Sequence, residues 1–152
     1  MRLVSPEEAR AYLADPLICE DCPDWEPWNL QPTSVAITAG VLKENGSGAR
    51  LIVELIYTRT HKAKEIKYRF TVFRREPWGN DPVYQLHIAQ SVGAKKHLHS
   101  HPHEHVGTDR LAGDAKWSEW GYDEVLALFC QRTNIAFRPL PPHPDHFALK
   151  SS

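Results

Sequence analysis

Alternation of apolar and polar side chains is strongest between residues 66 and 75. Apolar residues fall there at every second position, and the positions between them are mainly basic or hydroxylic. Side chains of a β-strand point alternately to its two faces, so this spacing predicts a strand with one buried and one polar face. The buried face would carry Ile66, Tyr68, Phe70 and Val72, and the polar face would mainly carry Lys67, Arg69, Thr71 and Arg75.

Three further segments carry strand patterns. Residues 33–42 are rich in β-branched side chains, and the segment that begins near Arg50 is apolar on both faces, which is typical of a central strand. Turn residues at 44–48 predict a hairpin between these two strands. The segment 83–90 alternates again and is the last of the set. The pattern therefore predicts an antiparallel β-meander of about four to five strands within residues 33–105.

Two helices are predicted outside the sheet. Ser5 is a favourable N-cap and Glu8 completes a capping box, so a first helix should run to about Ala14. Apolar residues at helical spacing in 122–134 predict a second helix, which ends at Asn134. The fold class is therefore α+β, with an N-terminal and a C-terminal helix packed on one face of the meander.

The chain of 152 residues, with 41% hydrophobic side chains, is expected to form a single domain around one core. The remaining segments show no regular pattern. These are the acidic helix and irregular segment 1–32, the loop 106–121 and the extended, proline-rich tail 135–152.

Charge is distributed unevenly, although the net charge is only -1. Residues 1–30 contain seven acidic and two basic side chains, whereas residues 43–75 contain nine basic and three acidic ones. The basic segment overlaps the predicted sheet, so one face of that sheet is expected to be positively charged. No apolar run approaches the roughly 20 residues that cross a bilayer, and the start lacks a signal-peptide pattern. We therefore expect a cytoplasmic protein without a membrane partner.

The three cysteines, Cys19, Cys22 and Cys130, are an odd number without an export signal, which favours reduced thiols. Cys19 and Cys22 have the spacing of half a zinc site, but no second C-x-x-C follows. Histidines such as His143 and His146 could complete a structural zinc site, whereas a surface pair of thiols is the simpler interpretation. Cys130 lies in the predicted C-terminal helix and is expected in the core.

The most unusual feature is a run of alternating histidines. Five of the nine histidines lie within nine residues, namely His97, His99, His101, His103 and His105. In a fully extended chain all five imidazoles would point to one face, with neighbours roughly 7 Å apart. Pro102 has no backbone donor, so we expect an edge strand or a strand that continues into a loop. Only part of the run would then converge.

Alternating imidazoles can chelate a metal ion. Imidazole suits zinc, copper, nickel and ferrous iron, and catalytic zinc commonly takes three protein ligands and one water. The five histidines of the run would be the ligands, with Glu104 or Asp109 as a carboxylate. This interpretation predicts a non-catalytic module that holds zinc or nickel, or an interaction module whose acidic N-terminal segment recruits a protein partner. Alternating histidines can also be merely the solvated face of a strand.

The same region could act on RNA without a cofactor. Histidine titrates near neutral pH and can move a proton at a ribose hydroxyl or a phosphate, while basic side chains stabilise the developing charge. If the strands 66–75 and 83–90 pair, Gln85 and His87 share the polar face with the basic residues of the first strand. This hypothesis is a ribonuclease with the catalytic residues His87, His97, His99 and His101 and the nucleic-acid-binding residues Lys67, Arg69 and Arg75.

A family resemblance rests on two motifs in the last half of the chain. The first is Tyr84-Gln85-Leu86-His87-Ile88, and the second is His97-Leu98-His99, followed by a helix and a proline-bearing tail. This layout resembles TumE-type toxins of toxin-antitoxin systems and related small domains. The resemblance implies a toxin that attacks RNA, with an antitoxin as its protein partner. It implicates His87, His97 and His99, whereas His101, His103 and His105 extend the run beyond the family's pattern.

Overall fold

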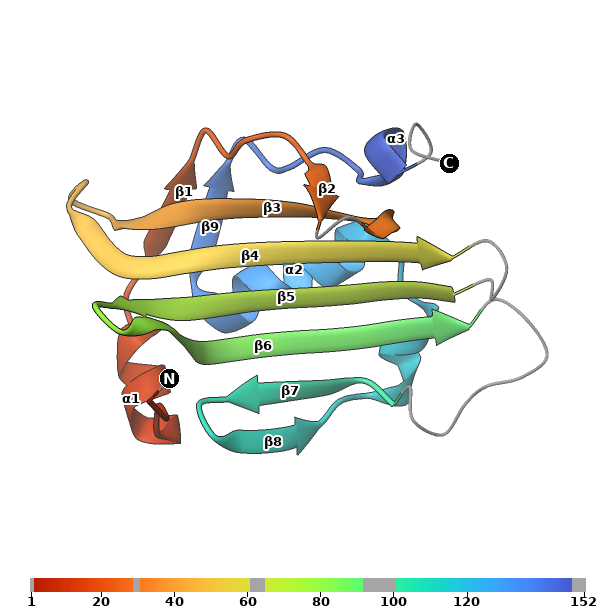
Figure 1. Ribbon diagram of the computed structural model, residues 1–152. Coiled ribbons are helices and arrows are strands. Elements are labelled where there is room, and N and C mark those ends of the chain that lie inside the picture. Colours follow the sequence, from red (N-terminus) through yellow and green to blue (C-terminus); the bar gives the residue numbers. More distant parts are fainter. Residues whose placement is uncertain (1, 29–30, 61–64, 92–100, 149–152) are drawn as a thin grey trace.

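The computed structural model describes residues 2–28, 31–60, 65–91 and 101–148. Within these ranges the chain has the expected α+β class, and a nine-stranded mixed sheet dominates it (Figure 1). The strands are β1 (Leu17–Glu20), β2 (Glu26–Trp28), β3 (Gln31–Lys43), β4 (Gly48–Thr60), β5 (Glu65–Glu76), β6 (Gly79–Ser91), β7 (His103–Val106), β8 (Asp109–Ala112) and β9 (Ile135–Arg138). The helices are α1 (Pro6–Tyr12), the 3-10 helix η2 (Ala115–Glu119), α2 (Tyr122–Thr133) and α3 (Asp145–Ala148).

Four long strands, β3 to β6, form the centre of the sheet. Each pairs antiparallel with the next one along the chain. The predicted hairpin between β3 and β4 is confirmed, and Gly46 in its turn has φ +88, a conformation that glycine adopts without steric cost. The predicted pairing of β5 with β6 is also confirmed, over the full length of both strands.

The expected size of four to five strands is wrong, because short strands extend the sheet on both sides. The order across the sheet is β8-β7-β6-β5-β4-β3-β1-β9, and β2 adds to β3. The expected loop 106–121 contains β8 and η2, the expected tail 135–152 begins with β9, and the segment 1–32 contains β1 and β2. Strand β9 pairs parallel with β1, which makes the sheet mixed.

Both helix boundaries that the sequence suggested have a physical basis in the structure. The Ser5 Oγ accepts a hydrogen bond from the Glu8 amide at 3.1 Å, so the predicted capping box of α1 is confirmed, although this helix ends at Tyr12. Asn134 is the C-cap of α2 in the left-handed conformation, as predicted. No helix among the described residues is long and apolar enough to cross a membrane.

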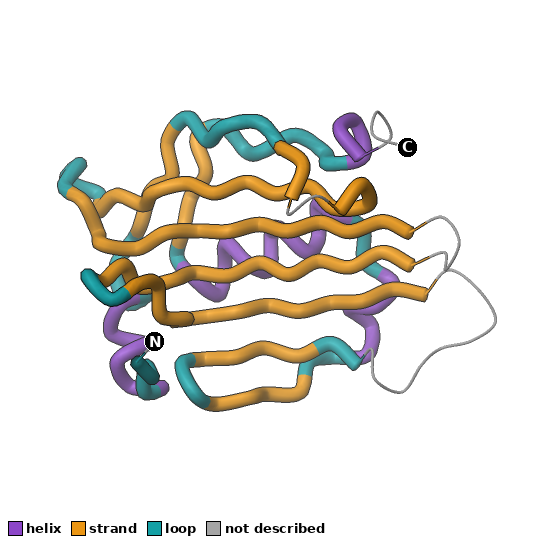
Figure 2. The backbone as a smooth tube through the Cα atoms, in the orientation of Figure 1, coloured by secondary structure: helices purple, strands orange, loops and turns teal. Residues whose placement is uncertain are grey.

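Helix α2 lies against one face of the sheet (Figure 2), and its buried residues belong to the core. Its Phe129 meets Phe70 of β5 with ring centroids 5.6 Å apart, and the ring of Tyr122 lies 6.4 Å from the same phenylalanine. Such edge-to-face pairs add to the free energy gained by burying the rings. The apolar alternation of β5 is therefore matched to the apolar stripe of α2.

N-terminal residues close the end of the sheet next to β6 and β7. Asp81 is fully buried, and its carboxylate accepts hydrogen bonds from the Arg74 guanidinium at 2.8 Å and from the Arg2 amide at 2.9 Å. In the β7–β8 turn, a Cβ added to Gly107 would lie 2.5 Å from the carbonyl oxygen of Val4. Close packing by the N-terminal segment therefore fixes the position of the β7–β8 hairpin.

Candidate functional site

The two faces of the long strands differ. Helix α2 covers one face, while the opposite face, turned towards the viewer in Figure 1, carries none of the described helices. We call this second face the outer face. Alternation along β5 and β6 sends their basic and polar side chains to it, because Tyr68, Phe70 and Leu86 point into the core. The candidate chemistry of the sheet therefore lies on the outer face.

Strand register aligns three candidate residues across the outer face. Arg69 of β5 is opposite His87 of β6, and His87 is opposite His103 of β7. The Cβ atoms of such cross-strand neighbours lie roughly 5 Å apart. One guanidinium and two imidazoles thus form a row across three strands.

A second row lies beside the first. Thr71 of β5 is opposite Gln85 of β6, and Gln85 is opposite His105 of β7. The Gln85 Nε2 donates a hydrogen bond to Thr71 Oγ1 at 3.0 Å, which fixes the amide towards β5. Lys67 precedes Arg69 by two positions on β5 and therefore shares its face.

Three imidazoles are in contact on this face. The ring centroids of His87 and His103 are 4.9 Å apart, and those of His103 and His105 are 5.0 Å apart, both in edge-to-face geometry. We call His87, His103 and His105 the histidine cluster. The run of alternating histidines therefore converges in part, as expected, and it does so with a histidine from another strand.

A backbone contact determines the tautomer of the central ring. The carbonyl oxygen of His101 lies 3.2 Å from Nδ1 of His103. A carbonyl only accepts, so Nδ1 of His103 carries the proton and donates it. In the neutral ring the lone pair is then on Nε2, which leaves this atom as the proton acceptor.

Beneath the cluster, a buried carboxylate anchors β7 to the core. Glu104 lies between His103 and His105 in sequence and points to the opposite face, where only 6% of it is exposed. It accepts hydrogen bonds from the Tyr84 hydroxyl at 2.5 Å and from the Arg132 Nε at 2.8 Å. Because Glu104 is fixed on the core side, its two histidine neighbours must point to the outer face.

Burial and positive neighbours disfavour protonation of two members of the cluster, His87 and His105. Burial, assisted by His103, Arg69 and Lys67, lowers the pKa of His87 to about 4. Burial also lowers the pKa of His105, with smaller contributions from His103 and Arg110. An anion placed beside these rings would favour their charged forms and raise both pKa values. At neutral pH and without a bound anion, His87 is therefore uncharged and lies next to fixed positive charge.

The lowered pKa of His87 predicts that the stability of the fold depends on pH. Between roughly pH 6.5, where an unfolded histidine titrates, and about pH 4, the unfolded chain binds more protons than the folded one. The free energy of unfolding therefore decreases as the pH falls through this window. We expect His87→Gln to remove part of that decrease, which melting curves between pH 7 and pH 4 would measure. The exposed His146 of α3 supplies the control His146→Gln, and parallel curves for the wild type and His87→Gln would contradict the prediction.

Two more side chains surround Arg69 on the outer face. Its guanidinium lies over the ring of Trp28 from β2, with Cζ 5.5 Å from the ring centroid, a cation–π geometry. Glu54 of β4 is opposite Thr71, and burial raises the pKa of its carboxyl while Arg69 opposes that effect. The contact with Trp28 orients Arg69 along the face. Lys67 pairs with Glu65 at 3.4 Å, but both side chains are solvated and such a pair is weak.

Not every predicted residue joins the histidine cluster. The His101 ring lies before β7, where its Nε2 donates to the Gly113 carbonyl at 3.1 Å. Of the two expectations for the run, the edge strand is wrong, because β7 lies between β6 and β8 and pairs with both. The other, a strand that continues into a loop, agrees with residues 101–102, which precede β7 and belong to no strand. His97 and His99 lie outside the described residues.

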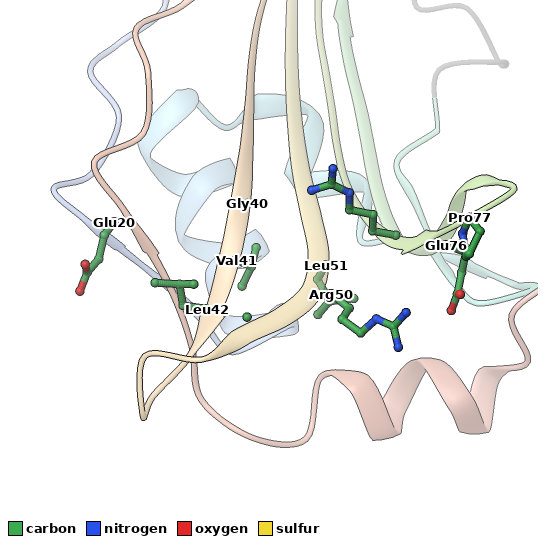
Figure 3. Close-up of a pocket in the computed structure, with 10 residues that line it drawn as sticks. Glu20, Gly40, Val41, Leu42, Arg50, Leu51, Glu76 and Pro77 are labelled. Carbon is green, nitrogen blue, oxygen red and sulfur yellow. The ribbon is translucent and has the colours of Figure 1, made fainter.

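Arg75 is separated from the other predicted RNA-binding residues. It follows Arg69 by six positions on β5, which corresponds to roughly 20 Å along a strand. There it lines an open pocket of about 830 Å³ together with Glu20, Arg50 and Glu76 (Figure 3). Its position therefore argues against a contact with the same phosphate as Arg69.

Sequence reasoning missed the role of Glu104 and Tyr84 as supports of the site. A signal was present in the sequence. Glu104 alternates with His103 and His105, so if these histidines point to the outer face, Glu104 must point to the core. A carboxylate at such a position is rarely buried without a partner. Its partners, Tyr84 and Arg132, come from β6 and α2 and could not be found from local spacing.

Metal binding has limited support in the described part of the chain. There, no group of three or more histidine, cysteine, aspartate or glutamate side chains is placed to hold a metal ion. Cys19 and Cys22 are close together, but neither His143 nor His146 completes a site with them among these residues. The metal site predicted for the run His97 to His105 includes residues outside the described ranges and stays a prediction.

Comparisons with known proteins do not identify a relative. No protein-family model matches the chain, and searches of curated proteins and of solved structures find no match. The resemblance to TumE-type toxins therefore stays a prediction, and the functional argument depends on the geometry of the outer face.

Proposed function

We propose that the outer face binds RNA and cleaves its backbone by acid-base catalysis, without a required cofactor. The observation that carries this proposal is the row Arg69, His87 and His103 on a face without a described helix. It combines a cation for a phosphate with imidazoles that can accept and donate protons.

The chemistry assigns different tasks to the members of this row. Nε2 of His103 accepts the proton of a ribose 2′-hydroxyl, because its Nδ1 already donates to the His101 carbonyl. The hydroxyl oxygen then attacks the adjacent phosphorus, and Arg69 stabilises the added negative charge. His87 donates a proton to the leaving 5′-oxygen. The bound phosphate favours the protonated form of His87 that this step needs, because an adjacent anion raises the lowered pKa of His87.

The segment before β7 belongs to the same proposal. His97 and His99 precede the cluster in sequence, and the resemblance to TumE-type toxins implicates them together with His87. We propose that they contribute to cleavage and that the toxin-like domain has an antitoxin as its partner. The double variant His97→Ala with His99→Ala should then lose RNA cleavage while its melting temperature stays nearly unchanged. A large loss of stability would assign these histidines a structural role instead.

The decisive experiment measures RNA degradation and metal content on one sample. Freshly purified, untagged protein is analysed for metals by mass spectrometry, and total RNA is incubated with it in the presence and absence of a chelator. Degradation that survives in metal-free protein supports the proposal. Near-stoichiometric zinc or nickel without degradation would instead favour the alternative, a non-catalytic metal-binding or protein-interaction module.

Salt dependence tests the binding part of the proposal. Each phosphate contact to single-stranded RNA contributes about 0.7 to the slope of log affinity against log salt concentration. The double variant Lys67→Gln with Arg69→Gln should therefore reduce this slope by about 1.4 if both side chains hold phosphates. Arg75→Gln removes an exposed cation from the same strand and is the matched control. Equal changes in slope per charge for the variant and the control would contradict a localised phosphate site.

A further inference from the structure

A second chemical group lies at the far side of the sheet from the histidine cluster. Strand β1 ends at Glu20, and Asp21 then adopts the left-handed conformation with φ 50. This turn brings the chain back on itself, so that the Sγ atoms of Cys19 and Cys22 lie 2.8 Å apart. All three cysteines are unbridged thiols in the structure.

The turn is held in place from the neighbouring strand. Cys19 is paired with Phe137 of β9, and the Asp21 amide donates to the Arg138 carbonyl at 3.1 Å. A non-glycine residue in the left-handed conformation costs energy, and here the β1–β9 pairing maintains it. The approach of the two thiols is therefore a consequence of the sheet and not of a flexible loop.

Solvent exposure differs between the two cysteine residues. Cys19 is 0% exposed within the core, whereas Cys22 is half-buried and borders on solvent. A small disulfide reagent can thus approach Cys22 and cannot approach Cys19 in the folded protein. This asymmetry is the one that a pair of attacking and resolving thiols requires.

We propose that Cys19 and Cys22 form a thiol-disulfide exchange site for low-molecular-weight disulfides, in which Cys22 attacks and Cys19 resolves. The proposal is independent of RNA cleavage. Cys19 lies on β1 and Cys22 in the turn that follows it, and neither belongs to the outer face of β5 to β7.

The proposed exchange reaction has two steps. The Cys22 thiol first releases its proton to solvent, and the resulting thiolate attacks one sulfur of the small disulfide. The other sulfur of the small disulfide leaves as a thiolate and takes up a proton. Cys19 then releases its proton and attacks the Sγ of Cys22, which expels the second small thiol. In total the protein dithiol loses two hydrogen atoms and is oxidised, while one small disulfide is reduced to two thiols.

Electrostatics agree with this assignment of roles. The hydrogen bond between the two sulfur atoms lowers the pKa of Cys22 and raises that of Cys19, and burial of Cys19 raises its pKa further. The Cys22 backbone amide also favours its thiolate. Burial raises the pKa of Cys130 to about 11, so this third thiol is a weaker nucleophile than Cys22 at neutral pH.

The test uses the reduced, full-length protein and glutathione disulfide as the probe. Intact mass should decrease by two hydrogen atoms without a lasting adduct. Cys19→Ser should instead accumulate one glutathione on Cys22, because nothing resolves the mixed disulfide. Cys22→Ser should stay unmodified while it remains folded by circular dichroism, and Cys130→Ser is the matched control that should react like the wild type.

A second measurement does not depend on any variant. Brief alkylation of the folded wild type with iodoacetamide, followed by peptide mapping, should modify Cys22 before Cys130 and Cys19. The proposal is overturned if excess glutathione disulfide leaves the wild-type mass unchanged, if the disulfide includes Cys130, or if the three cysteines are alkylated at equal rates.

Discussion

Replacing Glu104 with alanine should lower the free energy of unfolding by about 3 kcal/mol, since it leaves the buried Tyr84 hydroxyl without an acceptor and opens a cavity. For a chain of this size that corresponds to a fall in melting temperature of roughly 6–12 °C. The loss arises at the junction of β6, β7 and α2, because the carboxylate connects Tyr84 with Arg132. Denaturant unfolding followed by circular dichroism would measure it.

Two controls separate the buried network from a general effect of removing charge. Glu44→Ala removes an exposed acidic side chain from the β3–β4 turn and should change stability little. Tyr84→Phe removes the donor, so its effect should not add to that of Glu104→Ala, because the second change removes a partner that is already lost. Full additivity, or a loss no larger than that of Glu44→Ala, would show that Glu104 does not anchor β7.

Much of the sheet could be predicted because burial repeats along single strands. In β5, Tyr68 and Phe70 are core residues while Lys67 and Arg69 are exposed, and this difference in environment is what period-two alternation encodes. The same alternation in β6 places His87 on the face of Arg69 once the two strands pair. Local pattern is sufficient where each strand is long and its partner follows directly in sequence.

Short strands with distant partners could not be found in this way. Strand β9 has four residues, and its partner β1 lies more than a hundred positions earlier in the chain. Neither segment is long enough to show a period, so the parallel pair depends on tertiary contacts alone. For the same reason the sequence favours a surface pair of thiols at Cys19 and Cys22, although pairing with β9 buries Cys19 and turns Cys22 back onto it.

The sequence indicated that histidines would form the candidate site, but it did not indicate which individual histidines would do so. Alternation correctly indicated that histidines would converge on one face, but the fold selects which ones. The β7 strand begins only after Pro102, so His103 and His105 reach His87, while the His101 ring donates to the Gly113 carbonyl. Proline position and a hydrogen bond between distant residues decide this, and neither is visible in the spacing of the histidines.

The largest expected effect concerns catalysis, in the double variant His87→Gln with His103→Gln. Positioned proton transfer contributes typically 10²–10⁴-fold to a rate, so removing the proposed acid and base together should reduce RNA cleavage by about that factor or more. Glutamine keeps a polar side chain of similar size, and both rings lie on the outer face and not in the core, so stability should change little. Initial rates on a short RNA and melting curves of the same samples would measure both quantities.

The pattern of single variants carries further information. Residues that act as one unit show non-additive effects, so either single substitution should cost nearly as much activity as the double variant. RNA affinity should persist in all three proteins, because Lys67 and Arg69 are retained to hold the phosphates. His146→Gln, an exposed histidine on α3, controls for the loss of any imidazole. If the double variant cleaves RNA at the wild-type rate, catalysis lies elsewhere, and the outer face would then be a binding surface only.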